Sequence, residues 1–405
     1  MKLLFLVLVI GSVSSTYIDE NRPDSGAEWS DVGLGPVELI TKYKYPAELH
    51  YVFTEDGYRL TVVRIPYGRM CPKEKSKGVV LLQHGIFTSC FNWVLTGTKR
   101  GLGYILADSC YDVWMTNSRG NSLSLGHVKY NTQQYEFWDF SWHEMGKYDH
   151  PAVFDYILNA TGVPNITYVG HSQGTTSFLV FNILRPEYVN KVRAAFLLAP
   201  IAYLGHTRSF LLQILARFSK PIKAVADALK VYSILEQKDL ISNLGAIYCS
   251  TFRPVNTFLC ENMLFIAYGF DYEQTNLTYV AIQLKHELYG SSIKQLAHFG
   301  QLVSSKKFRQ YDYGIKNIQH YGQLTPPEYD LSKANAPIHL YYAANDRLSD
   351  LADVTRLINE LPNIKEQYLV PFDKFNHMDH IWADDIINLE YDHLVEEIDK
   401  YHNTQ

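Results

Sequence analysis

The stretch that most constrains this chain is VGHSQG at residues 169–174, which has the pattern G-x-S-x-G. A short β-prone run at residues 166–169 leads into it, and residues 175–184 form an apolar run of helical length. A serine between two glycines, placed between a strand and a helix, is typical of a tight turn that lifts the hydroxyl above a sheet. We therefore expect Ser172 to be a nucleophile; the alternative is an ordinary turn with a small polar residue.

Runs of strand length alternate with helical patterns along much of the chain. Strand-like runs occupy residues 49–53, 58–65, 79–82, 111–115, 166–169, 192–198, 338–342 and 366–370. Helical patterns occupy residues 103–108, 145–158, 175–184, 352–361 and 386–401. The first two runs flank Asp56-Gly57, which predicts a hairpin. The alternation predicts an α/β fold with a mostly parallel central sheet, preceded by an extended lead-in at residues 16–45.

The pattern changes between residues 201 and 311, where helical stretches dominate. They cover residues 210–218, 222–235, 259–270 and 293–303, several of them with an apolar face. We expect a helical cap inserted into the α/β core; the alternative is a set of core helices in one larger domain. The expected division is a signal peptide at 1–15, core at 16–200, helical cap and lid at 201–311, and core again at 312–405.

The N-terminus predicts export from the cytoplasm. Lys2 precedes an apolar run at residues 3–10, and small residues follow at 11–15, which is the pattern of a secretory signal peptide. That run is too short to span a bilayer, and no later segment has the uninterrupted length of a membrane helix. Three sequons predict glycosylation, at Asn159, Asn165 and Asn276. These features fit both the extracellular space and the lysosomal lumen, and they leave the oligomeric state undetermined.

A serine hydroxyl needs a base to take its proton and an acid to orient that base. Asp346 directly follows an expected strand, and His377 follows the last strand by a short loop, so both come after Ser172 in a suitable order. Asp350 is an alternative to Asp346, and His380 is an alternative to His377. The first of each pair is favoured because it is nearer to the end of its strand.

The oxyanion of a tetrahedral intermediate requires fixed N–H donors. One expected donor is the backbone of Gln173, which follows the serine at the start of a helix. The other lies in the loop after the first buried strand, where we expect Ile86, with Phe87 as the neighbour that could replace it. His84 and His171 also lie beside this backbone, and we expect them to pack or to form hydrogen bonds rather than to act as bases.

Cysteine and charge patterns exclude several functions. No C-x-x-C pair occurs, and His377, Asp379 and His380 lack the further ligands of a metal site, so we expect no metal. A serine nucleophile with a histidine base also needs no organic cofactor. The five cysteines leave an odd count, and Cys249 and Cys260 are the best candidates for a disulfide. The net charge of -5 without a long basic run argues against a nucleic-acid partner.

Several motifs occur in one order from about Tyr45 to near the C-terminus. They are QHG at 83–85, NW at 92–93, NSRGN at 117–121, KYD at 147–149, GHSQG at 170–174, NDRLSD at 345–350 and NH at 376–377. With these motifs the chain resembles the acid lipase family of α/β hydrolases, the family of gastric lipase and lysosomal acid lipase that includes many insect gut lipases. The resemblance implies hydrolysis of ester bonds in neutral lipids, triacylglycerols or steryl esters, at a lipid–water interface.

The resemblance also assigns roles to particular residues. It implies a triad of Ser172, Asp346 and His377, and oxyanion donors at Ile86 and Gln173. It further implies a cap disulfide between two cysteines, Cys249 and Cys260. The chain departs from the family where Tyr268 replaces a free cysteine, and at three cysteines that have no expected family counterpart, Cys71, Cys90 and Cys110.

Two other functions are compatible with such a chain. A lipid carrier built on the same fold would not catalyse, but such proteins usually lose part of the triad, and all three residues are present here. An esterase or acyltransferase for smaller or different acyl groups would keep the triad. Activity against emulsified and dissolved esters distinguishes this second alternative from a lipase.

Overall fold

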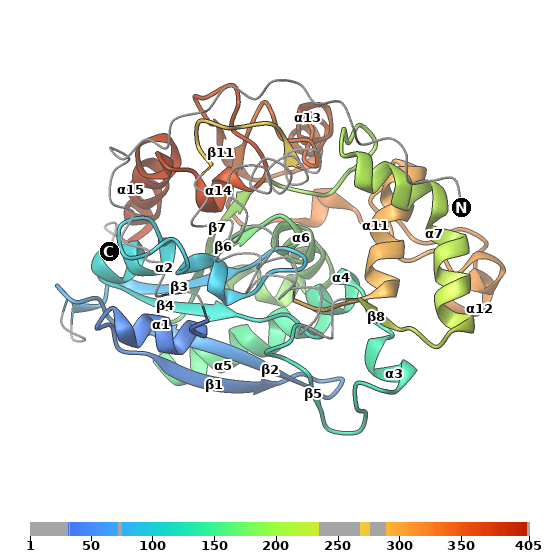
Figure 1. The fold of residues 1–405 in the computed structure, drawn as a ribbon, viewed down its shortest axis with the longest axis horizontal. Helices are drawn as coiled ribbons and strands as arrows, with labels where there is room; N and C mark the ends of the chain where they lie inside the picture. Colours follow the sequence, from blue (N-terminus) through green and yellow to red (C-terminus); the bar gives the residue numbers. More distant parts are fainter. Residues whose placement is uncertain (1–30, 32, 72–74, 235–267, 276–288, 403–405) are drawn as a thin grey trace, which may run out of the picture.

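The computed structural model describes residues 31, 33–71, 75–234, 268–275 and 289–402 (Figure 1). The strands are β1 (Glu48–Phe53), β2 (Tyr58–Ile65), β3 (Gly78–Gln83), β4 (Tyr111–Thr116), β5 (Gly126–His127), β6 (Ile166–His171), β7 (Val192–Leu198), β8 (Ser233–Ile234), β9 (Ser291–Ser292), β10 (Ile338–Tyr342) and β11 (Ile364–Leu369). The longer helices are α1 (Pro36–Lys42), α2 (Leu102–Asp108), α5 (His150–Thr161), α6 (Gln173–Leu184), α7 (Phe210–Ala228), α11 (Ile293–Ser305), α13 (Leu351–Glu360) and α15 (Asp392–His402). Shorter turns are η3 (Cys90–Trp93), α3 (Tyr135–Trp138), α4 (Trp142–Glu144), η4 (Met145–Asp149), η5 (Pro186–Lys191), η6 (Gly314–Lys316), α12 (Asn317–Tyr321), η7 (Leu331–Lys333), α14 (Asp379–Trp382) and η8 (Ile387–Tyr391).

A nine-stranded sheet forms the centre of the described part of the chain. Its order is β1-β2-β4-β3-β6-β7-β10-β11, with β5 beside β2. The strands β1, β2 and β4 pair antiparallel, whereas β4, β3, β6, β7, β10 and β11 run parallel to one another. The predicted fold class is therefore confirmed, and the hairpin expected around Asp56-Gly57 is β1–β2.

Both faces of the sheet are buried, as the continuous apolar runs of its inner strands predict. In β3, Val79 and Leu81 point into a core shared with α5 and α6, while Val80 and Leu82 point into a second core shared with α1, α2 and α15. Successive side chains of a strand face opposite sides, so one apolar strand contributes to both cores. The resulting layers leave the carboxyl ends of the parallel strands as the edge where loops can form a site.

The structure corrects several predicted elements. The lead-in expected to be extended at residues 16–45 contains a helix, α1, because Pro36 suits a first turn and the Glu38 carboxylate accepts the Gly35 N–H at 2.7 Å. The helix predicted at 145–158 begins with the π-helical turn η4 before α5. The helix predicted at 386–401 is likewise divided into the π-helical turn η8 and α15.

The region expected to form a cap is described in part. The two helices predicted at 210–218 and 222–235 are one helix, α7, which ends at Ala228, and Ile234 lies in β8. α7 packs against α11 to one side of the sheet (Figure 1). Most of the helix predicted at 259–270 lies outside the described residues, and the division of the chain into core and cap stays a prediction.

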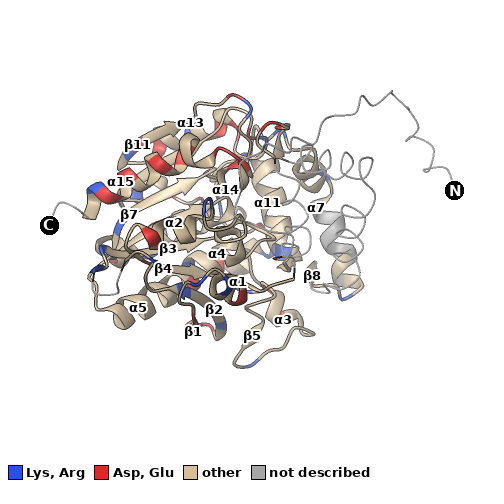
Figure 2. Cartoon of the chain, turned by 60° about the vertical axis from the view of Figure 1, so that its left-hand side comes forward, with Lys and Arg blue, Asp and Glu red and all other residues tan. Residues whose placement is uncertain are grey.

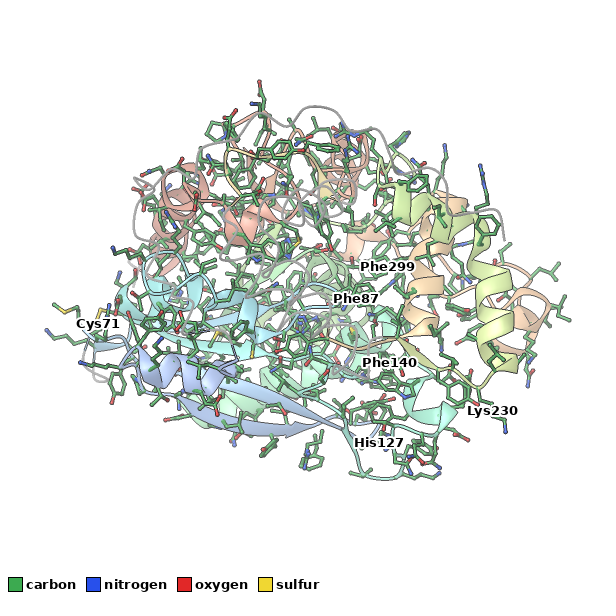
Figure 3. The ribbon with its side chains drawn as sticks, in the orientation of Figure 1. Cys71, Phe87, His127, Phe140, Lys230 and Phe299 are labelled. Carbon is green, nitrogen blue, oxygen red and sulfur yellow. A yellow bond between two sulfur atoms is a disulfide. The ribbon has the colours of Figure 1, made fainter. Side chains whose placement is uncertain are left out.

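A disulfide joins Cys71 to Cys110, with their Cα atoms 5.4 Å apart. In Figure 3, Cys71 lies at the edge of the molecule, away from Phe87 near its centre. The sequence offered no signal for this pair, because its residues are brought together by the parallel pairing of β3 with β4, which begins at Gly78 and Tyr111. Cys90 is buried and free. The disulfide expected between Cys249 and Cys260 lies outside the described residues.

The surface of the described part is mixed in charge. Acidic and basic residues occur along the same elements, and both signs are present on α15 (Figure 2). Each helix in the described ranges is too short or too polar to cross a lipid bilayer.

A buried arginine joins the turn of the first hairpin to the helical layer. Arg119 is 1% exposed; its Nε donates to Oδ1 of Asp149 at 2.8 Å, and its Nη1 donates to Oδ2 of Asp56 at 2.6 Å. Burial raises the pKa of Asp149 to about 6, although the Arg119 guanidinium opposes that shift. Burial also acts to raise the pKa of Asp56, but Arg119 outweighs it and lowers that pKa. The three residues form one hydrogen-bonded network around the buried Arg119 guanidinium, and this network requires all its members.

Replacing Arg119 with Met leaves the buried Asp149 carboxylate and the half-buried Asp56 carboxylate without their cation. We expect the free energy of unfolding to fall by about 3–5 kcal/mol, because an uncompensated buried charge is strongly destabilising. Urea unfolding followed by circular dichroism measures the loss. Arg59→Met is the matched control, since Arg59 is exposed on β2. A loss for Arg119→Met no larger than that of the control would contradict the role of this network.

Candidate active site

Ser172 lies at the junction of β6 and α6 with φ 53° and ψ -118°, a conformation that non-glycine residues rarely adopt. Hydrogen bonds on both sides hold the turn. The Ser172 N–H donates to the Leu198 carbonyl at 3.0 Å, and the Thr175 hydroxyl donates to the Ser172 carbonyl at 2.6 Å. The sequence pattern therefore leads to the strained turn that was expected for a nucleophile.

The loop after β3 lies against this turn. Gln83, the last residue of β3, pairs with Gly170 of β6, so the next residues must pass beside Ser172. A Cβ atom placed on Gly85 would lie 3.1 Å from the Cβ of Ser172, and one placed on Gly174 would lie 2.7 Å from the Gln83 carbonyl oxygen. Both glycines are therefore required for the close approach of the two segments.

The structure brings the three expected side chains together. His377 Nε2 lies 2.8 Å from the Ser172 hydroxyl, and His377 Nδ1 lies 2.7 Å from Asp346 Oδ2. All three are buried, with 4%, 2% and 0% of Ser172, His377 and Asp346 exposed. Asp346 follows β10, and His377 follows β11, so the parallel sheet delivers both to the edge where Ser172 lies.

The Asp346 carboxylate is held firmly in place. Its Oδ1 accepts the N–H groups of Leu348 and Ser349, each at 2.8 Å, which leaves Oδ2 for His377. Burial acts to raise the pKa of this carboxyl, but the nearby His377 and the two N–H donors outweigh it and lower the pKa below its ordinary value. Asp346 is therefore ionised where an imidazole would need an acceptor.

The alternative acid and base have other partners. Asp350 lies 2.8 Å from the Arg208 guanidinium and accepts the N–H of Ala352 at the start of α13. His380 Nδ1 lies 2.6 Å from Glu390, and both of these side chains are fully buried. The geometry thus places neither alternative beside Ser172.

The two expected oxyanion donors lie on the two segments that meet at Ser172, the loop after β3 and the start of α6. Gln173 is the first residue of α6, so its N–H has no acceptor within the helix. Ile86 is half-buried in the loop that passes Ser172, and Phe87 after it has φ 61°, a second strained backbone position. Ile86 and Gln173 remain the predicted donors, with Phe87 as the alternative.

Two neutral histidines support these loops. His84 Nδ1 donates to the Gly85 carbonyl at 2.6 Å, and its Nε2 accepts the Ser118 N–H at 3.1 Å, which fixes the tautomer. Burial lowers the pKa of His84 to about 4. His171 Nε2 donates to the His377 carbonyl at 2.9 Å, and burial lowers its pKa well below the ordinary value. Both therefore form hydrogen bonds, as expected, and position the backbone.

One contact of the candidate base was not expected. The Tyr268 ring lies parallel to the His377 imidazole, with centroids 6.0 Å apart and planes inclined by 13°. In the sequence, Tyr268 differs from the pattern of the resembling family only by standing where that family has a cysteine. Nothing in the local pattern indicates the contact, because Tyr268 and His377 are far apart in the chain.

The predicted glycosylation sites differ in exposure. Asn159 is exposed near the end of α5, whereas Asn165 is half-buried and its Oδ1 accepts the Arg193 Nε–H at 2.7 Å. Asn276 lies outside the described residues. Glycosylation at all three positions stays a prediction.

One group of side chains in the described ranges has the composition of a metal site. His339, Glu366 and Glu397 place ligand atoms within 4.8 Å of one another. His339 and Glu366 lie near the starts of β10 and β11, and Glu397 lies on α15, whereas Asp346 and His377 follow the ends of these two strands. The Lys400 ammonium already contacts Glu397, so the group contains its own cation.

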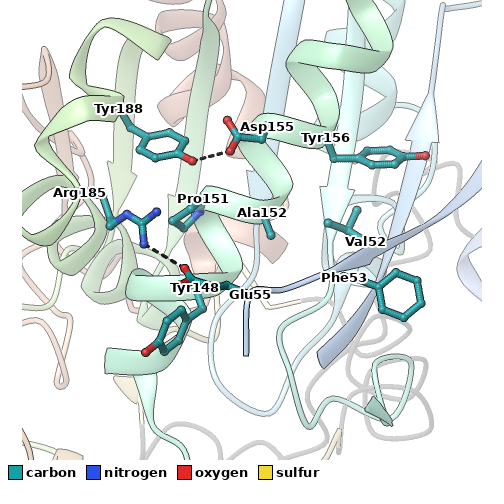
Figure 4. Close-up of a pocket in the computed structure, with 10 residues that line it drawn as sticks. All are labelled: Val52, Phe53, Glu55, Tyr148, Pro151, Ala152, Asp155, Tyr156, Arg185 and Tyr188. Atoms are coloured by element: carbon teal, nitrogen blue, oxygen red, sulfur yellow. Dashed lines mark hydrogen bonds and ion pairs between the residues drawn. The ribbon is translucent and has the colours of Figure 1, made fainter. Parts of the chain in front are cut away.

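A pocket of about 350 Å³ opens on the surface between β1, α5 and η5 (Figure 4). Its lining residues are Val52, Phe53, Glu55, Tyr148, Pro151, Ala152, Asp155, Tyr156, Arg185 and Tyr188. Polar groups in its wall bond to one another: Tyr188 donates to Asp155 at 2.5 Å, and Arg185 lies 3.6 Å from Glu55. None of the residues around Ser172 lines this pocket.

Replacing Gly174 with Ala tests the close approach of β3 to the serine turn. We expect the free energy of unfolding to fall by about 1–3 kcal/mol, because the new methyl group would overlap a backbone carbonyl that cannot move freely. Thermal or urea unfolding measures the change. Gly35→Ala is the matched control, since its methyl group would meet only the Glu38 carboxylate, at 3.5 Å. Equal stability of the two variants would refute the steric requirement.

Comparisons with known proteins agree with this architecture. A family model described as a partial alpha/beta-hydrolase lipase region matches residues 36–97, and one described as the alpha/beta hydrolase fold matches residues 78–234. Lipase 3 of Drosophila melanogaster is 40% identical over 365 residues, which cover 90% of this chain and 92% of that protein. Gastric triacylglycerol lipase of Bos taurus is 38% identical and covers 90% of this chain and 91% of its own.

More distant comparisons extend the same result. The human lysosomal acid lipase/cholesteryl ester hydrolase is 35% identical, over 99% of this chain and 100% of that protein. A solved structure from Sulfolobus solfataricus superimposes with a TM-score of 0.55 over 87% of this chain and 99% of that one. Its sequence identity is 14%, so it supports the fold alone.

Proposed function

This chain belongs to the lipase family of gastric triacylglycerol lipase and lysosomal acid lipase, and we propose that it hydrolyses neutral lipid esters through Ser172, His377 and Asp346. It is an α/β hydrolase and an ester hydrolase of the lipase type. The observation that carries the proposal is the pair of short contacts of His377, at 2.8 Å to Ser172 and 2.7 Å to Asp346. These distances are within reach for proton transfer.

The proposed reaction follows from the roles of these groups. Ser172 Oγ attacks the ester carbonyl while His377 Nε2 takes its proton. Asp346 keeps the other imidazole nitrogen protonated and stabilises the imidazolium that forms. The backbone N–H groups of Ile86 and Gln173 bind the oxyanion. His377 returns the proton to the leaving alcohol, and water then releases the fatty acid from the acyl-enzyme by the same steps.

The proposed substrates are triacylglycerols or steryl esters presented at a lipid–water interface. The names of two relatives support this class, since one is a triacylglycerol lipase and one a cholesteryl ester hydrolase. Exposed apolar side chains on α7 add physical support, because Phe210, Leu211 and Phe218 are 57%, 57% and 48% exposed. With its proposed signal peptide and sequons, the enzyme is secreted or delivered to the lysosomal lumen.

Replacing Ser172 with Ala should abolish the hydrolysis of both emulsified trioleoylglycerol and emulsified cholesteryl oleate. The reason is that no hydroxyl would remain to form the acyl-enzyme. Fatty-acid release measured by titration at constant pH reports the loss. Ser122→Ala is the matched control, since the Ser122 hydroxyl has no hydrogen-bonding partner in the described part of the chain. Turnover by Ser172→Ala comparable to that of the control would exclude Ser172 as the nucleophile.

Replacing Asp346 with Asn should lower kcat by about 10³–10⁴-fold, because an amide cannot stabilise the imidazolium and favours the wrong tautomer. The same substitution at Asp350, the alternative acid, should change kcat little. Hydrolysis of a dissolved short-chain ester compares the two variants without interfacial effects. The opposite ranking of the variants would assign the acid to Asp350.

A further inference from the structure

One described segment contacts both loops of the proposed triad. Residues 268–275, called the clamp segment below, lie between two stretches that the structure does not describe. The Tyr268 carbonyl accepts the Arg347 N–H at 3.2 Å, and the Gly269 carbonyl accepts the Asn376 amide N–H at 3.3 Å. Arg347 follows the aspartate of the triad, and Asn376 precedes its histidine. The clamp segment therefore spans the two loops whose separation sets the triad geometry.

The other end of the clamp segment is also fixed. The Gln274 carbonyl accepts the Asp384 N–H at 3.0 Å. The Gln274 side chain accepts the Asp385 N–H at 2.8 Å and donates to the Asp385 carboxylate at 3.2 Å. These bonds tie the segment to the chain just beyond α14. Between the two ends lies a single buried carboxyl group, Asp271.

Asp271 is 0% exposed, and its two oxygens have different surroundings. Oδ1 accepts the N–H groups of Glu273 and Gln274 at 3.0 and 3.1 Å. Oδ2 is buried and has no hydrogen-bond donor in the described part of the chain. A buried acceptor without a donor costs free energy, so this oxygen requires a proton from a neighbouring group.

The neighbour of Asp271 is a second buried carboxyl group, Asp379, which lies two residues after His377. Asp379 is 3% exposed, and its Oδ2 accepts the Asn376 N–H at 2.7 Å. The Asp271 and Asp379 carboxyl groups lie within hydrogen-bonding reach of each other. Burial, and then the charge of Asp271, raise the pKa of Asp379 well above its ordinary value. Burial likewise raises the pKa of Asp271.

We propose that Asp271 and Asp379 share one proton, and that this carboxylic acid–carboxylate hydrogen bond holds the clamp segment against the loop that carries His377. Asp379 is the protonated member, because Asp271 already accepts two backbone N–H groups as an anion does. Its O–H donates to the buried Oδ2 of Asp271. The pair is a positioning device for the proposed hydrolysis, and this role rests on the proposed function.

The charged groups around the pair are matched with other partners. They are Glu273 with Lys374, Asp346 with His377, His380 with Glu390, Asp384 with Arg100, and Asp385 with the Gln274 amide. The Arg347 guanidinium lies over the Phe270 ring, 4.9 Å from its centroid. Lys374 and Arg100, the other cations among these groups, contact their own carboxylates. A shared proton therefore neutralises one of the two carboxylates of the Asp271–Asp379 pair.

The raised pKa of Asp379 determines how the stability of the folded protein changes with pH. A carboxyl group that holds its proton more tightly in the folded protein contributes stability that is fully present below its unfolded pKa, about 3.9. That contribution is lost as the pH rises through the folded pKa. Two adjacent anions then repel each other, and the clamp segment loses its bond to the loop of His377. The active geometry is accordingly favoured in acid.

Replacing Asp379 with Asn tests the shared proton. An amide supplies a permanent N–H to Asp271 Oδ2, and its oxygen can still accept the Asn376 N–H. The measurement is the profile of kcat against pH for a dissolved short-chain ester. We expect the fall of kcat at high pH to shift to a higher pH, by at least about one pH unit, with KM nearly unchanged. Asp373→Asn is the matched control, because Asp373 is an exposed carboxylate in the same loop.

Coincident alkaline limbs for the wild type and Asp379→Asn would overturn the proposal. Asp271→Asn supplies the N–H from the other side, so it provides the same test if Asp379→Asn does not fold.

The melting temperature as a function of pH provides a readout independent of catalysis. It should fall toward neutral pH more in the wild type than in either Asn variant, and parallel curves would equally overturn the shared proton. Absence of esterase activity in the wild type would instead refute the proposed function.

Discussion

The strained backbone of Ser172 is the constraint on which the site depends. A non-glycine residue at φ 53° costs about 1–3 kcal/mol and persists only where its surroundings fix it. Here the fixing groups are the end of β7, the first turn of α6 and the loop after β3, all of which reach the same edge of the sheet. The register of Gln83 with Gly170 decides that this loop, with Ile86, passes the serine. The two cores on either face of the sheet keep that register.

Burial then determines which groups around the serine carry charge. His84 and His171 are neutral and serve as fixed hydrogen-bonding partners, because burial lowers the pKa of each. Asp346 remains an anion, because two N–H donors and His377 offset the cost of its burial. The pKa of Asp379 is raised instead, first by burial and then by the charge of the neighbouring Asp271 carboxyl group. Two buried aspartates, Asp346 and Asp379, thus have pKa values shifted in opposite directions by the groups around them.

The sequence predicted the parts of this arrangement that depend on local pattern. The turn at Ser172 and the strands that precede Asp346 and His377 follow from apolar runs and glycine spacing, which short windows contain. The helix at α1 was missed because it is short, and its start depends on a contact between Gly35 and Glu38. The Cys71–Cys110 bridge and the stacking of Tyr268 on His377 were missed for another reason: both join segments that only the packed sheet and its loops bring together.

We propose that the fold holds Ser172, His377 and the two predicted oxyanion donors in the geometry that acyl transfer requires. The most direct test is a crystal structure of the protein after reaction with an alkyl phosphonate that mimics the acyl-transfer intermediate. We expect phosphorus bonded to Ser172 Oγ, with the phosphoryl oxygen about 2.7–3.1 Å from the backbone nitrogens of Ile86 and Gln173. An adduct on another residue, or a phosphoryl oxygen directed away from both nitrogens, would contradict this proposal.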